Sequence, residues 1–342
     1  MRALLFLAAT VAVALAGCGD SGIAVPDGAK PPPEGAYARP LGMAVQEPAA
    51  RADDAYVRAF VDTATSVTPE NELKWAIVHP EANRYDFSHA DAIIDLARKT
   101  GKRVRGHTLV WDQQLPAWVT GRTWTPDALR AALIDHIKTV VGHYKGKVAS
   151  WDVVNEPFEE DGMWTRDLFY RVLGPSYVDV ALRAARDADP EAKLFVNELA
   201  VERPGPKRDA LLALAADLRT RGVPLDGIGL QDHTTVTGAP TQADLEDTMQ
   251  RIAALGLDTE ITEADVAIPP STPTTPAVLD AQAQAFAAAA RACVSSARCT
   301  GLTVWGVDDR WSWLGAKLRP LLYDVQAQPK PALAAVRGAL TR

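Results

Sequence analysis

The chain has 342 residues, enough for two ordinary domains or for one β/α barrel with a short appendage. Its 47% hydrophobic and 23% charged residues are close to the values of globular proteins and exclude an intrinsically disordered chain. The 43 acidic residues outnumber the 36 Lys and Arg, the formal net charge is −7, and no Lys/Arg cluster occurs, so we expect no nucleic-acid partner.

Residues 1–17 have the pattern of an export signal. Arg2 gives the positive start, and the apolar run from Ala3 to Ala16 is too short to span a membrane. The ending Leu-Ala-Gly-Cys has the form of a bacterial lipobox, which predicts cleavage before Cys18 and acylation of its thiol; the alternative is a plain secretory signal. We therefore expect an exported cell-envelope lipoprotein that meets the membrane only through its lipid anchor.

Residues 18–36 are rich in Pro and Gly and show no hydrophobic periodicity, which predicts a tether between the lipid and a folded domain over 37–342. Only Cys293 and Cys299 remain if Cys18 is acylated. In an exported protein we expect these two to form a disulfide, and two reduced core thiols are the alternative.

After the tether, short apolar runs alternate eight times with longer amphipathic runs. The short runs predict strands buried on both faces at Leu41–Val45, Ser66–Pro69, Arg103–Val110, Val148–Val154, Lys193–Asn197, Gly227–Gln231, Asp258–Thr262 and Gly301–Trp305. The longer runs predict helices, including Ala128–His143, Asp209–Arg221, Leu245–Leu255 and Val278–Val294. Eight such units, with neither a Gly-x-Gly-x-x-Gly fingerprint nor a P-loop, favour a single (β/α)8 barrel over an open nucleotide-binding sheet.

In a β/α barrel, catalytic groups lie at the carboxyl ends of the strands. Polar and aromatic residues follow most of the predicted strands at this end: Glu70, Asn71, Lys74, His107, Trp111, Asp112, Asn155, Glu156, Asn197, Glu198, Gln231, His233, Glu263, Asp265, Trp305 and Trp313. Singly, each has an ordinary explanation: Lys74 as a solvated charge, His107 as a hydrogen-bonded core histidine, a strand-end Glu as a loop acid. Their convergence on one face predicts an active site.

Two of these residues, Glu156 and Glu263, are expected on opposite sides of the barrel mouth. A carboxylate pair across a cleft is what glycoside hydrolysis requires, since one group protonates the leaving oxygen while the other attacks or activates water. The six His residues show no metal-ligand spacing, so a metal-dependent hydrolase is disfavoured and we expect neither a metal nor a cofactor.

Six segments together resemble glycoside hydrolase family 10, whose best-known members are endo-β-1,4-xylanases. They are Thr68–Trp75, Gly106–Trp111, Trp151–Glu156, Gly227–Gln231, Ile261–Glu263 and Thr303–Val307. They occur in order between about residues 40 and 325 and so cover the whole expected domain. The resemblance implies a (β/α)8 barrel that hydrolyses xylan or xylo-oligosaccharides with retention.

By this resemblance Glu156 is the general acid/base and Glu263 the nucleophile. His233 would hydrogen-bond Glu263, with Asp265 as partner of the imidazole, and Asn155 and Gln231 would contact the sugar at the cleavage point. The resemblance places the glycone subsites at Glu70, Asn71, Lys74, His107 and Trp111, under Trp305 and Trp313. The resemblance also implies a disulfide between Cys293 and Cys299, since many family members have one at this place.

The chain departs from the family pattern at three places. Asp112 stands where His is frequent, Ala264 where Leu is usual, and Glu198-Leu199 where Asp-Tyr is usual. The last change removes an aromatic side chain that the resemblance implies on the leaving-group side.

Two other functions remain open. One is a related β-1,4-glucanase or mixed xylanase/cellulase. Its substrate carries one more hydroxymethyl group per sugar, which requires only a small difference between the binding pockets. A non-catalytic envelope glycan-binding lipoprotein would need the aromatic platforms alone, and the presence of both glutamates argues against it. We expect a monomer.

Overall fold

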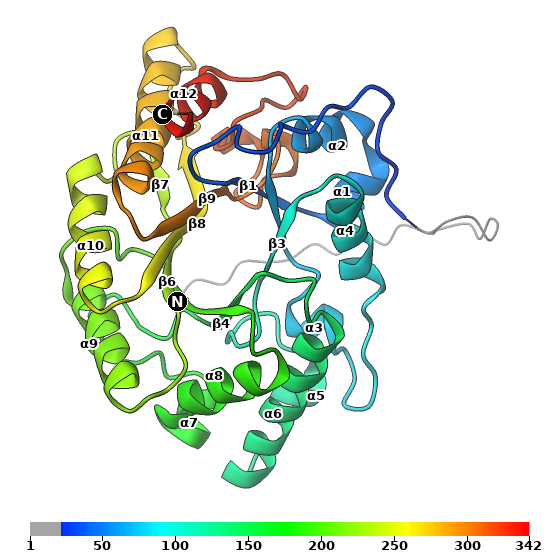
Figure 1. Cartoon of the computed structure of the whole chain (residues 1–342), viewed down its shortest axis with the longest axis vertical. Coiled ribbons are helices and arrows are strands. Elements are labelled where there is room, and N and C mark those ends of the chain that lie inside the picture. Colours follow the sequence, from blue (N-terminus) through cyan, green and yellow to red (C-terminus); the bar gives the residue numbers. More distant parts are fainter. Residues whose placement is uncertain (1–21, 342) are drawn as a thin grey trace.

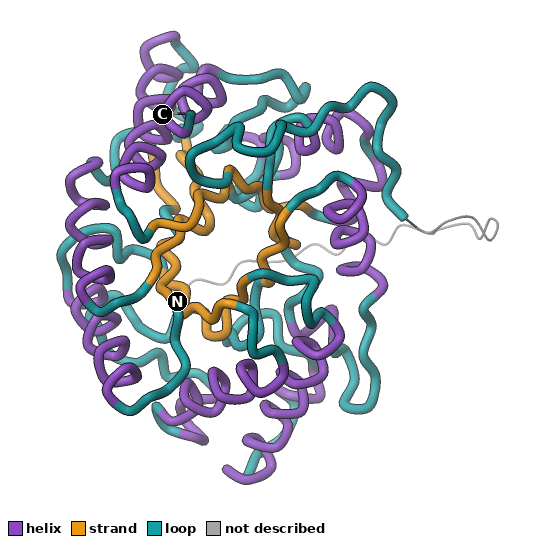
Figure 2. Tube along the Cα trace, viewed as in Figure 1, coloured by secondary structure: helices purple, strands orange, loops and turns teal. Residues whose placement is uncertain are grey.

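The computed structural model describes residues 22–341. Eight parallel strands form a closed ring, with helices around its outside (Figure 2). The ring strands are β1 (Leu41–Val45), β2 (Ser66–Pro69), β3 (Arg103–Gly106), β4 (Ser150–Asn155), β5 (Lys193–Glu198), β6 (Gly227–Leu230), β8 (Asp258–Ala267) and β9 (Cys299–Val304). Pairing of β6 with β8 and of β1 with β9 completes the closure, which confirms the predicted (β/α)8 barrel.

The helices between the strands include all four that were predicted, each within a few residues of its expected bounds. They are α1 (Glu47–Ala52), α2 (Asp54–Val61), α3 (Trp75–Val78), α4 (Ser88–Lys99), α5 (Ala117–Thr120), α6 (Pro126–His143), α7 (Leu168–Leu173), α8 (Ser176–Ala188), α9 (Pro206–Thr220), α10 (Gln242–Ala254), α11 (Pro276–Ser295) and α12 (Pro331–Leu340). Caps set several starts: the Thr125 hydroxyl accepts the Ala128 N–H before α6, and Thr241 and Asp244 form a capping box at α10.

Most strands lie within two residues of their predicted bounds, and two differ by more, both at the carboxyl end. β3 ends at Gly106, where a Cβ would lie 2.2 Å from the buried Trp151 ring, and the chain then leaves the ladder until Val110 pairs with Val154. β8 continues to Ala267 because the extra strand β7 (His233–Thr235) pairs with its last residues. The early end of β3 and the extension of β8 shape the mouth of the barrel.

At the opposite end of the barrel the Cys293–Cys299 disulfide joins the end of α11 to the start of β9, with 5.1 Å between the two Cα atoms. Both residues are buried. The predicted pairing is confirmed.

The predicted signal peptide over 1–17 and Cys18 lie outside the described residues. Residues 22–36 contain neither helix nor strand, but the chain is already packed at Ile23, which is 2% exposed. The Arg58 guanidinium of α2 donates to the carbonyl of Asp27 at 2.8 Å, and the Lys30 N–H donates to Asp62 at 2.6 Å. In Figure 1 this dark blue segment runs along the outside of the barrel beside α2.

The folded part therefore starts before the predicted boundary at residue 37. An isolated apolar residue among prolines gives no periodic signal, and for this reason the sequence pattern misses it. Among residues 22–341, no helix is long and apolar enough to cross a membrane.

We predict that Ile23→Ala lowers the free energy of unfolding by about 2 kcal/mol, because the substitution leaves a cavity under the N-terminal segment. Val25→Ala is the matched control, since Val25 is 38% exposed and should cost less than about 0.5 kcal/mol. Equilibrium urea unfolding of both variants and the parent measures the difference. Equal stability of the two variants would show that the segment adds nothing to the fold.

Candidate active site

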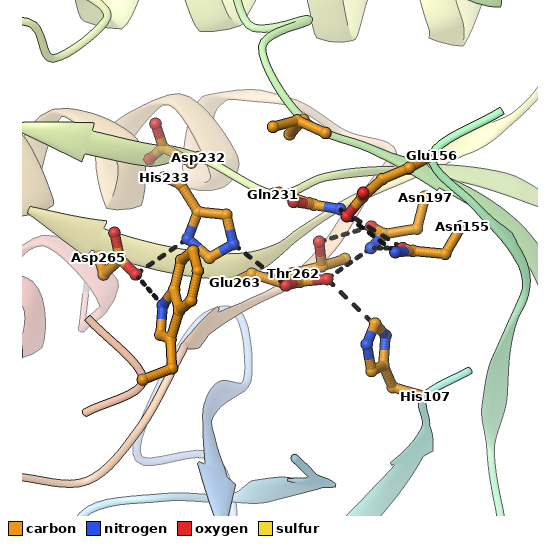
Figure 3. A network of polar contacts seen from close by, with 12 residues as sticks. His107, Asn155, Glu156, Asn197, Gln231, Asp232, His233, Thr262, Glu263 and Asp265 are labelled. Carbon is orange, nitrogen blue, oxygen red and sulfur yellow. Dashed lines mark hydrogen bonds and ion pairs between the residues drawn. The ribbon is translucent and has the colours of Figure 1, made fainter. Parts of the chain in front are cut away.

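The carboxyl ends of the strands bring both glutamates and several other predicted site residues into one network of polar contacts (Figure 3). Glu156 directly follows β4, Glu263 lies within β8, and His233 begins β7. Asn155, Asn197 and Gln231 lie between the two glutamates, and most of the contacts between these side chains join residues from different strands or their following loops. The convergence expected from the strand-end pattern is therefore present.

Glu263 is buried, with 4% of its surface exposed. Its Oε1 accepts a hydrogen bond from the Asn197 amide at 2.6 Å, and its Oε2 lies 3.2 Å from Nε2 of His233. Nδ1 of His107 lies 3.7 Å from Oε1. Burial by itself raises the pKa of this carboxyl, but His107 and the hydrogen bond from His233 outweigh burial and hold the pKa below its usual value. Glu263 is thus kept ionised in the interior.

His233 links Glu263 to a second buried carboxylate. Its Nδ1 lies 2.9 Å from Oδ2 of Asp265, and the Trp313 indole N–H donates to the same oxygen at 2.9 Å. Burial lowers the pKa of the imidazole, but Asp265 and Glu263 together raise it well above its usual value. A doubly protonated ring can donate from both nitrogens, which is what two flanking carboxylates require.

On the other side of Glu263, His107 contacts a buried ion pair formed by Asp152 and Arg105. Its Nδ1 hydrogen-bonds Oδ2 of Asp152 at 2.9 Å, and Asp152 accepts both guanidinium branches of Arg105. Burial raises the pKa of Asp152, but Arg105 outweighs burial and the pKa is lowered. The three side chains are buried.

Within residues 22–341, His107, Asp152 and Glu263 form the one group of side chains close enough to share a metal ion. His107 and Asp152 are joined by a hydrogen bond, and Glu263 lies 3.7 Å from the same ring nitrogen. The Arg105 guanidinium occupies both Asp152 oxygens and opposes a second cation there. The arrangement therefore has the chemistry of a hydrogen-bonded charge chain rather than of a metal centre.

Glu156 is surrounded by hydrogen-bond donors at the mouth of the barrel. Its Oε1 accepts from the amides of Asn155 and Gln231, each at 2.9 Å, and its Oε2 accepts from the Trp111 indole N–H at 3.0 Å. The backbone of Glu156 has a φ of 56°, the left-handed region that non-glycine residues rarely adopt. Such a conformation costs on the order of 1–3 kcal/mol and persists only where the surroundings enforce it.

The amides of Asn155 and Asn197 connect the two glutamates. Asn197 Nδ2 donates to Oδ1 of Asn155 at 2.8 Å as well as to Glu263, and the Thr262 hydroxyl donates to Oδ1 of Asn197 at 2.7 Å. Asn155 in turn donates to Glu156. The relative placement of the carboxylates is thus set by two buried side-chain amides.

The predicted glycone residues lie together after β2 and β3. Glu70 is buried and accepts from the Gln46 amide at 2.9 Å, and burial raises its pKa to about 7 despite this hydrogen bond. Lys74 is buried, donates to Asn71 at 3.0 Å and lies 4.9 Å from the centre of the Trp111 ring. Lys74 is therefore not a solvated charge but lies buried beside Asn71 and Trp111.

The two predicted platform residues differ in exposure. Trp305 is 4% exposed and packs edge-on against the His107 ring, with 4.9 Å between ring centres. Trp313 is 53% exposed, one of three large hydrophobic side chains that reach the surface within residues 22–341. Its indole N–H is held by Asp265, so the exposed ring has a defined orientation beside His233.

The three departures from the family pattern lie in different environments. Ala264 is buried, Asp112 is exposed beside Trp111, and Leu199 is partly exposed after β5. Glu198 is fully buried and forms an ion pair with Lys207, so it does not face the cleft as its strand-end position suggested.

Sequence reasoning named Asn197 only as one of the strand-end residues, without a role, and it did not single out Asp152, Arg105 or Gln46. Asn197 is the next-to-last residue of β5 and pairs in register with Asn155 of β4, and this position was the signal that the sequence offered. Arg105 and Asp152 lie inside strands, where charged residues are rare unless they are paired. Gln46 gives no such signal, because its contacts with Glu70 and the Trp311 carbonyl join segments distant in sequence.

Comparisons with known proteins agree with this geometry. The model of the Glycosyl hydrolase family 10 matches residues 34–339. "Endo-1,4-beta-xylanase A" of Phanerodontia chrysosporium is 43% identical over 264 residues, which cover 77% of this chain and 64% of that protein, so the chain spans slightly less than two thirds of this relative. "Endo-1,4-beta-xylanase A" of Fusarium oxysporum is 37% identical, with 81% of this chain and 88% of that protein covered.

Solved structures are similar over almost the entire chain. Native xylanase 10B of Thermotoga maritima has a TM-score of 0.86 at 35% identity and covers 90% of this chain and 96% of its own. Xylanase 10B of Thermotoga petrophila in complex with xylobiose has a TM-score of 0.85 at 35% identity, with 88% and 94% covered. The strand-end constellation, the closed barrel and these matches together show that the chain belongs to glycosyl hydrolase family 10.

Proposed function

We propose that this protein is a retaining endo-1,4-β-xylanase that acts on xylan and xylo-oligosaccharides as a monomer and without a cofactor. The observation that carries the proposal is the ionised, buried Glu263 linked through Asn197 and Asn155 to Glu156. Supporting it, relatives named endo-1,4-beta-xylanase are about 40% identical, and a similar solved structure is described as a complex with xylobiose.

In the first step the Glu263 carboxylate attacks the anomeric carbon while the bond between this carbon and the leaving oxygen breaks. The electron pair of that bond goes to the oxygen, which takes the proton of Glu156. In the second step Glu156 accepts a proton from water, the hydroxide oxygen bonds to the anomeric carbon, and Glu263 leaves as a carboxylate. Glu263 must be ionised at the start, which is the state that His107 and His233 favour.

The remaining residues have roles in holding the sugar. Asn155 and Gln231 lie beside Glu156, where they would contact the sugar at the cleavage point. The glycone side would be formed by Glu70, Asn71, Lys74, His107 and Trp111, under Trp305 and the exposed ring of Trp313. Flat indole rings suit sugar faces because both surfaces are apolar and broad.

We predict that Glu263→Ala lowers kcat on xylan by about 10⁴-fold or more, because the group that forms the covalent bond is lost. Glu191→Ala, at an exposed site before β5, is the matched control and should keep full activity. Reducing-sugar release from xylan and carboxymethyl cellulose is measured side by side, with and without EDTA. Hydrolysis of cellulose as fast as xylan would favour a glucanase, and loss of activity in EDTA would favour a metal enzyme. A protein whose migration in a gel is retarded by xylan, but which cuts neither polymer, would be a glycan-binding protein.

The pH dependence of kcat/KM gives a separate test of the Glu263 environment. Activity is lost as the pH falls through the pKa of Glu263, and His233 holds this pKa below its usual value. We predict that His233→Gln moves the acid limb to higher pH by about one unit, since a hydrogen bond to a charged group contributes about 1.5–3 kcal/mol. His143→Gln, on the outside of α6, is the control. An acid limb that stays in place would contradict the assignment.

We also propose that the protein is a lipoprotein of the bacterial cell envelope, cleaved after residue 17 and acylated at Cys18. The support is the lipobox pattern Leu-Ala-Gly-Cys behind a short apolar run. Four residues, 19–22, separate Cys18 from the buried Ile23, so the anchor would hold the barrel close to the membrane.

We predict that the parent chain partitions with membranes and takes up labelled palmitate, while Cys18→Ala does neither. Export of the parent chain without uptake of labelled palmitate would indicate a plain secretory signal.

A further inference from the structure

Glu198 and Lys207 form a buried ion pair beside the active site. Glu198 ends β5 with none of its surface exposed, and Lys207, in the first turn of α9, is 5% exposed. The Lys207 ammonium nitrogen lies 2.8 Å from Oε1 of Glu198. A cation at a helix N-terminus is unfavourable for the helix itself, because the helix dipole is positive there. The pair is therefore not explained by the stability of α9.

The Glu198 carboxylate holds two backbone segments. Its Oε2 accepts the N–H of Phe158 at 3.1 Å, and its Oε1 accepts the N–H of Leu199 at 3.0 Å. Phe158 is two residues after Glu156, in the loop between β4 and α7. One buried carboxylate thus joins the loop that carries Glu156 to the end of β5.

Every backbone N–H between Glu156 and Phe158 is donated to β5. The Glu156 N–H donates to the Asn197 carbonyl at 2.9 Å, Pro157 has no N–H, and the Phe158 N–H donates to Glu198. These bonds bracket the residue whose φ is 56°. A strained conformation of this kind needs contacts on both sides to persist, and Glu198 supplies the contact on the carboxyl side.

Lys207 favours the ionised state of Glu198 that these bonds require. Burial raises the pKa of Glu198 to about 7, although Lys207 acts in the opposite direction. A protonated carboxyl would have to donate its own O–H at a place where two N–H groups and an ammonium already point at it. Without the lysine, one of these donors would lose its acceptor.

We propose that Glu198 and Lys207 are positioning residues for the general acid: together they hold the Glu156–Phe158 backbone so that the Glu156 carboxyl points at the leaving oxygen. The inference rests on the proposed function. Glu263 is held by Asn197, His107 and His233, and its hydrogen bonds do not involve the pair. Loss of the pair should thus impair protonation of the leaving group and spare attack by Glu263.

Leaving-group chemistry separates these two effects. When the bond to the anomeric carbon breaks, a phenolate oxygen of high basicity needs the Glu156 proton, whereas 2,4-dinitrophenolate leaves as a stable anion without one. The test compares kcat/KM for phenyl and 2,4-dinitrophenyl β-xylobioside, since this constant reports the first step. Lys207→Met removes the charge at nearly constant volume, and Lys207→Arg restores it.

For Lys207→Met we expect kcat/KM to fall at least 30-fold on the phenyl glycoside and less than threefold on the dinitrophenyl glycoside, with partial recovery of the phenyl activity in Lys207→Arg. Lys193→Met, which is exposed at the start of β5, is the matched control and should change neither value. The ratio of the two activities in one preparation does not depend on how much of the protein is folded. If Lys207→Met does not yield soluble protein, Lys207→Gln is measured in the same way.

Equal losses on the two glycosides would overturn the inference, because a general structural defect affects both substrates alike. Unchanged activity on both would overturn it as well. A parent chain that hydrolyses neither glycoside would overturn the proposed function and this inference with it. A parent that hydrolyses both, with a variant ratio equal to that of the parent, would leave the proposed function standing and remove only the positioning role.

Discussion

The structure depends on keeping one carboxylate ionised in a barrel interior from which water is largely excluded. Burial of Glu263 opposes its charge, so the fold must bring donors to it from several strands. Asn197 comes from β5, His107 from the end of β3 and His233 from β7. Only a closed parallel barrel places the ends of these strands around one point, and the position of β8 at the closure puts Glu263 there.

The two histidine donors are largely enclosed, and each needs a second carboxylate as a hydrogen-bond partner. This requirement extends the site in both directions, from His107 to Asp152 and Arg105 on one side and from His233 to Asp265 on the other. Buried ion pairs add little net stability because desolvation offsets their attraction. These contacts therefore serve to keep Glu263 ionised more than to stabilise the fold. Removing one member would leave its neighbour buried and unpaired.

The segments that carry the site residues are supported mainly from β5 and the loop after it. Asn197 and Glu198 hold the backbone around Glu156, and the Glu202 carboxylate accepts the N–H of Asp232 at 2.8 Å. Glu156 and Asp232 both have left-handed backbone conformations, with φ of 56° and 59°. Carboxylates on and after β5 thus hold, at the ends of β4 and β6 on either side of it, the backbone turns that direct side chains into the cleft.

The sequence by itself determined the eight strand–helix units, the disulfide partners and the set of residues at the strand ends, because hydrophobic periodicity and capping are local properties. It also placed both glutamates at the carboxyl ends of strands, although Glu263, expected after its strand, lies within the longer β8. The direction of a strand-end side chain was decided only by the tertiary structure. Lys74 turned out to be buried, Glu198 turned away from the cleft to pair with Lys207, and Ile23 packed against the barrel, because each depends on segments that meet only when the barrel closes.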